Sequence, residues 1–159
     1  MSGLNEVLKR PLDALLPHRD PMVLLTRAVG MEGDDFVAEV DITKTSPFFD
    51  GAGVPVWIGL EYMAQTVALF SGVEGALEDA GGRARPGMLL GTRAFTCARQ
   101  SFFEGETLRI VVRKVLTQDN GISAMDCLIE DQAKAELARA QLTVIQLPDM
   151  ESMAALGRP

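Results

Sequence analysis

Histidine and cysteine are scarce in this sequence, which limits the metal and redox chemistry that it can support. The 159 residues include one histidine and two cysteines, and the cysteines do not form a CxxC pair. Because a structural zinc site takes about four such ligands at short spacing, we expect no metal site. Cys97 and Cys127 lie in apolar runs typical of strands, which predicts two reduced thiols in the core.

Cofactor motifs and excess positive charge are also missing. The sequence contains no P-loop, no GxGxxG and no GxSxG, so we expect no nucleotide-type cofactor. Fifteen Lys and Arg residues stand against 22 Asp and Glu residues, which gives a net charge of −7 and a pI of about 4.7. Nucleic acids and anionic membranes bind basic surfaces, so this balance argues against both as partners.

Uninterrupted apolar runs are rare as well. The first 20 residues lack the apolar centre of a secretory signal, which predicts a cytoplasmic protein. The stretch from Val54 to Val73 is long enough to cross a membrane. However, it contains Glu61, Gln65 and Thr66, and no Lys or Arg lies close to either end. We favour the alternative of a helix buried at the centre of a soluble domain.

What is present is the pattern of one α+β domain. We assign residues 1–147 to a single domain and 148–159 to a loosely attached tail. A short helix is predicted within 4–16 and one long helix from Trp57 to about Ala80, after Pro55. Strands are predicted at 22–32, 34–43, 87–97, 107–117, 122–131 and 135–147. An antiparallel sheet curled around the long helix suits this order.

Four segments of the chain resemble one known family. They are "LLPHRDPMVLLTR" from Leu15, "PFFDG" from Pro47, "EYMAQ" from Glu61 and "LLGTRAFTCARQSFFEGETLRI" from Leu89. The residues of these motifs and their order along the chain resemble those of the hotdog-fold, FabZ-like 3-hydroxyacyl-acyl-carrier-protein dehydratases across about residues 13–147. The variant "GVPVWIGLEYMAQ" is most similar to the dehydratase-like proteins of aryl-polyene pigment clusters. The resemblance implies a hotdog fold and an acyl thioester, on acyl carrier protein or CoA, as the bound molecule.

The resemblance also implies where the site lies. Glu61 stands at the glutamate position of the family's helix motif, and Gln65 lies four residues later on the same face of the helix. Such dehydration needs a base for the C2 proton and an acid for the departing C3 hydroxyl. A carboxyl group in an apolar wall tends to stay protonated, which suits Glu61 to be the acid. The substrate-binding residues expected at the loop and helix start are Gln65, Gly51, Ala52, Gly53, Trp57 and Gly59.

The general base is the main departure from the family. The catalytic histidine of the family follows the glycine of "FFxG", but here Ala52 follows Gly51. The sole histidine, His18, matches the opening motif with Arg19. For both we expect a structural role in the Pro-flanked turn, and a role of His18 as the base is the less favoured alternative. Asp50 is the nearby carboxylate that could replace the base, although an aspartate before a glycine also forms turns. The sequence therefore predicts slow or no dehydration by the purified chain alone.

Several alternatives remain open at this level. Glu61 could be a structural residue paired with Arg19, Arg27 or Arg93. The chain could be an active dehydratase, a non-catalytic subunit that supports an active homologue, or an acyl-thioester hydrolase, because a fold alone does not assign chemistry. The resemblance implies a homodimer or heterodimer with a second hotdog subunit, with the "FFDGAGVP" loop at the contact. A basic patch for an acidic carrier protein is expected at Arg83, Arg85 and Arg93.

Overall fold

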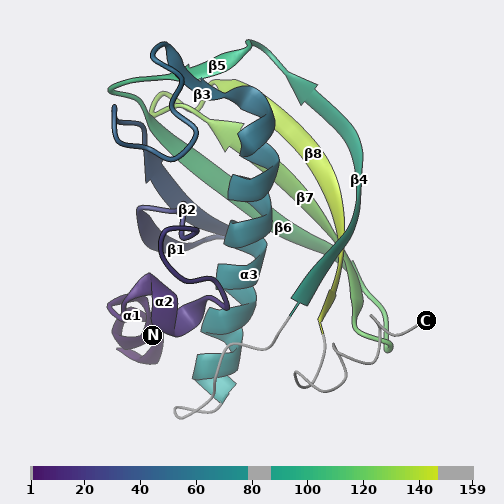
Figure 1. Cartoon of the computed structure of the whole chain (residues 1–159). Coiled ribbons are helices and arrows are strands. Elements are labelled where there is room, and N and C mark those ends of the chain that lie inside the picture. The colour runs from purple at the N-terminus through teal and green to yellow at the C-terminus, as the bar shows by residue number, and fades with distance from the viewer. Residues whose placement is uncertain (1, 79–86, 147–159) are drawn as a thin grey trace, which may run out of the picture.

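A computed structural model describes residues 2–78 and 87–146 of the chain (Figure 1). Its helices are α1 (Ser2–Leu8), α2 (Leu12–Leu15), the 3-10 turn η1 (Val56–Ile58) and α3 (Gly59–Glu78). Its strands are β1 (Arg27–Glu32), β2 (Asp35–Asp41), β3 (Gly53–Pro55), β4 (Gly87–Cys97), β5 (Ser101–Phe103), β6 (Thr107–Thr117), β7 (Ile122–Glu130) and β8 (Glu136–Gln146). The predicted tail and the predicted end of the long helix at Ala80 lie outside the described residues.

Six strands form one antiparallel sheet in the order β1-β2-β6-β7-β8-β4. The sheet curls around α3, while α1 and α2 lie beside the C-terminal half of that helix (Figure 1). This arrangement confirms the predicted α+β hotdog fold. Among the described helices, none is long and apolar enough to cross a membrane.

The long helix begins where the sequence predicts. Pro55 has the fixed extended backbone that precedes a helix, and η1 leads directly into α3. Half of the α3 residues are buried, including Met63, Leu69 and Val73 against the concave face of the sheet. Phe36, Ala38 and Val40 of β2 and Ile42 just after it are buried as predicted, but Val37 is buried as well, so the predicted alternation is not strict.

Two departures from the predicted strands have local causes. The first strand begins at Arg27 rather than Met22, because the backbone of Met22 and Leu24 bonds to the side chain of Gln65 and not to a neighbouring strand. A small sheet of β3 and β5 forms where a loop was predicted. Gly53 permits this pairing, since a Cβ there would lie 2.2 Å from the backbone oxygen of Phe102.

The two cysteines differ in their environments, which corrects one prediction. Cys127 in β7 is buried, as predicted, but Cys97 at the end of β4 is exposed. The reason lies in the sheet order, because β4 is an edge strand that pairs with β8 and with no other strand of the described residues. Met88, Leu89 and Leu90 of the same strand are exposed too. The apolar pattern of β4 therefore does not correspond to burial within this chain.

Candidate functional site

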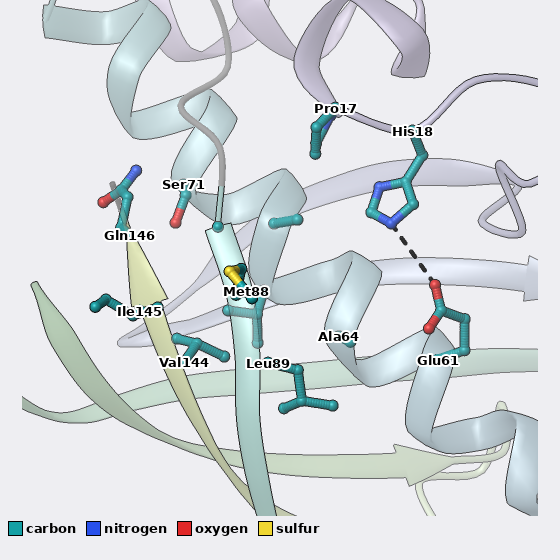
Figure 2. Close-up of a pocket in the computed structure, with 13 residues that line it drawn as sticks. Pro17, His18, Glu61, Ala64, Ser71, Met88, Leu89, Val144, Ile145 and Gln146 are labelled. Carbon is teal, nitrogen blue, oxygen red and sulfur yellow. Dashed lines mark ion pairs between the residues drawn. The ribbon is translucent and has the colours of Figure 1, made fainter. Parts of the chain in front are cut away.

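A cavity of about 240 Å³ lies between α3, the turn after α2 and the strands β4 and β8 (Figure 2). Its lining is Pro17, His18, Glu61, Ala64, Val67, Ala68, Ser71, Gly87, Met88, Leu89, Val144, Ile145 and Gln146. Most of these side chains are apolar, and the two titratable groups, His18 and Glu61, face each other at one end (Figure 2). Such a cavity suits an apolar chain with a polar group at one end.

Glu61 is held by Gln65 one helical turn later. The Nε2 atom of Gln65 donates a hydrogen bond of 3.0 Å to Oε1 of Glu61. The same amide donates to the carbonyl of Met22 at 2.7 Å and accepts from the N–H of Leu24 at 2.9 Å. Gln65 is fully buried. The three bonds use both N–H groups and the oxygen of its amide, which fixes the orientation of the side chain. The carboxylate is thereby tied to the chain segment before β1.

The exposure of Glu61 corrects the expectation that it is buried. Its side chain is 40% exposed in the single chain, because it lies at the end of the cavity and not within its wall. Among the described residues, no arginine pairs with Glu61. Arg27 pairs instead with Glu39 and Asp41, and Arg19 donates to backbone carbonyls. The arrangement leaves the carboxyl group facing the cavity without a guanidinium partner.

His18, for which the sequence favoured a structural role over that of a base, lies next to Glu61 in the site. Its Nε2 atom lies 3.6 Å from Oε1 of Glu61, and its side chain is 29% exposed. The other ring nitrogen, Nδ1, is buried and has no hydrogen-bond partner. The residues are 43 positions apart in the sequence, so no local spacing indicates the contact. The available signal was that this is the only histidine of the chain.

The turn that carries His18 is fixed by its neighbours. Arg19 donates hydrogen bonds to the carbonyls of Asp13, Leu16 and His18 at 2.9–3.1 Å, which closes the turn after α2. Leu15 packs its backbone against Gly72 of α3, where a Cβ would lie only 1.9 Å from the carbonyl oxygen of Leu15. These contacts set the position of His18 relative to α3.

The loop before α3 does not line the cavity. Asp50 accepts hydrogen bonds from the N–H groups of Ala52 and Gly53, both at 3.1 Å, and these bonds lower the pKa of its carboxyl group. Gly51, which follows Asp50, has a φ of +93°, a conformation that favours glycine. These contacts favour the turn-forming role of Asp50 over the role of a base.

Three further residues near the start of α3 face elsewhere. Gly59 was expected to let a substrate approach the backbone, but its α-carbon faces the core, where a Cβ would lie 2.8 Å from Ile129. Trp57 is 60% exposed on the surface and packs edge-on to Phe48. Tyr62 points into the core, and burial raises its pKa to about 12. Arg83 and Arg85 of the predicted basic patch lie outside the described residues, and Arg93 is exposed on β4.

The antiparallel sheet curled around one long helix defines a hotdog-fold protein. The chain belongs to the ApeP-like family, because the model of that family, described as ApeP dehydratase, matches residues 10–155. This confirms the FabZ-like resemblance and its aryl-polyene branch.

Individual relatives agree with this family. A subunit of the dehydratase heterocomplex ApeI:P from Xenorhabdus doucetiae is 28% identical, with a TM-score of 0.80 over 94% of this chain and 99% of that one. FabZ 3-hydroxyacyl-acyl-carrier-protein dehydratases of Streptococcus pyogenes, such as that of serotype M5 (strain Manfredo), are 38% identical over 65 residues. The match covers 38% of this chain and spans about half (47%) of the length of those curated relatives.

More distant structures share the fold alone. A hypothetical thioesterase with coenzyme A from Streptococcus pneumoniae TIGR4 is 15% identical, with a TM-score of 0.58 over 76% of this chain and 84% of that one. The PaaI protein of E. coli is 13% identical, with a TM-score of 0.57 over 77% of this chain and 79% of that one.

Proposed function

We propose that this chain is a dehydratase subunit that removes water from 3-hydroxyacyl thioesters carried by acyl carrier protein or CoA. The observation that supports this most is the position of Glu61. Its carboxyl group is fixed by Gln65 at the end of an apolar cavity, and no arginine among the described residues pairs with it. A group so placed is suited to protonate the departing C3 hydroxyl while the acyl chain lies along Ala64 and Val67.

The assembly that we propose is a dimer with a second hotdog subunit. The protein from Xenorhabdus doucetiae that this chain resembles comes from a dehydratase heterocomplex. Two surfaces of the single chain support such an association. The edge strand β4 exposes Met88, Leu89 and Leu90, and the loop before α3 exposes Phe48 beside Trp57. Large exposed apolar side chains of this kind mark association surfaces.

The experiment is a comparison of Glu61→Gln with the unchanged chain. We expect dehydration of 3-hydroxyacyl thioesters, followed by enoyl absorbance, to fall by roughly 10²–10⁴-fold in the variant, the usual contribution of a general acid. The amide oxygen of glutamine can still accept the hydrogen bond of Gln65, so the fold should not change. Glu74→Gln is the matched control, because Glu74 lies on the same helix, pairs with Lys114 and does not line the cavity. Equal rates for Glu61→Gln and the unchanged chain would refute the role of Glu61.

The second candidate is a non-catalytic subunit that supports an active homologue. The observation that favours it is Ala52, which stands where the family has its catalytic histidine. This alternative predicts that Glu61→Gln has no effect on a mixture with a second hotdog subunit. A hydrolase function is supported by the shared fold alone, because the thioesterase structures are only distantly similar.

A further inference from the structure

The sole histidine of the chain lies where a general base is needed. Nε2 of His18 is 3.6 Å from Oε1 of Glu61, and both side chains line the same apolar cavity (Figure 2). In reactions that remove a proton and a hydroxyl group from adjacent carbons, the base and the acid must both reach the same two-carbon unit. Two groups separated by 3.6 Å at one end of a cavity satisfy this condition.

We infer that His18 is the general base and Glu61 the general acid, so that a single chain carries both groups. This inference rests on the proposed dehydration of 3-hydroxyacyl thioesters. It replaces the structural role that the opening motif suggests for His18. It also removes the need for a histidine at position 52 or from a partner subunit.

The contacts of the imidazole argue against a purely structural role. A histidine that holds a turn together bonds its ring nitrogens to backbone groups, but Nδ1 of His18 is buried without a partner and Nε2 faces Glu61. A buried polar atom without a partner destabilises the fold and calls for an explanation. The turn is already held by other means, namely Arg19 on three carbonyls and Leu15 against Gly72. The imidazole is therefore available for chemistry.

The proposed step balances without an added reagent. Neutral His18 takes the C2 proton on Nε2, and the electron pair of the C–H bond forms the C2–C3 double bond. The C3–O bond breaks, and the carboxyl group of Glu61 gives its proton to the oxygen, which leaves as water. The imidazolium and the carboxylate then stand 3.6 Å apart, and transfer of the proton from Nε2 to Glu61 restores the starting state. No electrons are gained or lost overall.

Asp50 is the competing candidate for the base. Its carboxylate already accepts two backbone N–H bonds, it does not line the cavity, and a carboxylate stabilised in this way is a weak base. A neutral imidazole is the more effective proton acceptor near neutral pH. An Asp50→Asn variant should therefore retain more activity than a His18→Gln variant.

The test separates the base from the acid by using two substrates in D₂O. A 3-hydroxyacyl-CoA reports dehydration, and the saturated acyl-CoA of the same length reports exchange of its C2 protons, which needs a base but no acid. For His18→Gln we expect both rates to fall by roughly 10²–10⁴-fold. For Glu61→Gln we expect dehydration to fall while exchange continues. Lys44→Gln, which removes an exposed side chain outside the cavity, is the control and should change neither rate.

A second measurement does not depend on the folding of a variant. Diethylpyrocarbonate applied to the folded, unchanged chain should abolish exchange as one imidazole is modified, and hydroxylamine should restore it. Because the chain has one histidine, the modified group is identified without ambiguity. Added imidazole should also restore exchange to a His18→Ala variant, which a lost structural contact would not explain.

The outcomes distinguish this inference from the proposed function. Dehydration by His18→Gln at the unchanged rate would overturn the role of His18 and leave the dehydratase function standing. Exchange that depends on His18 without any dehydration would overturn the dehydratase function and support His18 as a base. An unchanged chain that catalyses neither reaction alone, but dehydrates when mixed with a second hotdog subunit, would overturn the inference that one chain carries both groups. Inactivity in that mixture as well would overturn the proposed function.

Discussion

The amide of Gln65 donates a hydrogen bond of 3.0 Å to the carboxylate of Glu61, one helical turn before it. The other polar atoms of the amide bond to the backbone of Met22 and Leu24. One buried side chain thus connects the start of α3, the segment that precedes β1 and the candidate acid. Fold stability and the geometry of the site are coupled through this residue.

We expect Gln65→Leu to lower the free energy of unfolding by about 1–3 kcal/mol, because a buried N–H and a buried carbonyl lose their partners. Urea unfolding followed by circular dichroism measures the change. Gln132→Leu is the matched control, since Gln132 is exposed and makes a single long bond to Thr107. A stability of Gln65→Leu equal to that of the control would show that the backbone of Met22 and Leu24 finds other partners.

Two glycines of α3 should respond in opposite directions to alanine. At Gly72 a Cβ would meet the carbonyl oxygen of Leu15 at 1.9 Å, so Gly72→Ala should destabilise the fold by about 1–3 kcal/mol. A Cβ at Gly75 would meet no atom of the described residues within 4 Å apart from its chain neighbours and its own helix backbone, so Gly75→Ala should stabilise the fold by up to about 1 kcal/mol through higher helix propensity. Thermal unfolding of both variants checks the pair. A neutral Gly72→Ala would mean that α2 does not pack on α3 as closely as the structure shows.

The two thiols should differ in their reactivity towards a disulfide reagent at pH 8. Burial raises the pKa of the Cys127 thiol to about 12, so at pH 8 it stays protonated and is not nucleophilic. Cys97 is exposed, and one thiol per chain should therefore react in the folded, unassociated protein. Both should react after unfolding in urea. Rapid reaction of two thiols in the native chain would contradict the burial of Cys127.

The loop before α3 should contribute to association. We expect the chain to be at least dimeric at micromolar concentration, and Phe48→Asp to weaken the dimer by placing a charge in an apolar contact. Phe48 has a φ of +67°, and aspartate tolerates this conformation well, so the loop should keep its shape. Met31→Asp is the control, because Met31 is a comparably exposed apolar residue on β1, at the opposite sheet edge from β4. Light scattering that finds a monomeric unchanged chain, or an unaffected Phe48→Asp dimer, would refute this contact.

Local periodicity determined much of this protein. The alternation in β2 and the apolar run after Pro55 suffice to predict the buried face of one strand and the start of α3. The strands at 87–97 and 107–117 begin and end where their sequences indicate. The Glu61–Gln65 contact also follows from sequence, because residues four positions apart on a helix are neighbours.

Tertiary structure alone decided the features that join distant segments. The exposure of Cys97 depends on β4 being an edge strand, which its own residues do not specify. The core-facing position of Gly59 depends on Ile129, and the close packing of Gly72 depends on Leu15. The contact between His18 and Glu61 depends on how the turn after α2 crosses α3. Spacing along a chain determines which residues share a face of a helix or strand, whereas the packing of the whole domain determines which faces contact each other. The contact between the candidate base and the candidate acid, 43 positions apart, is therefore a result of packing.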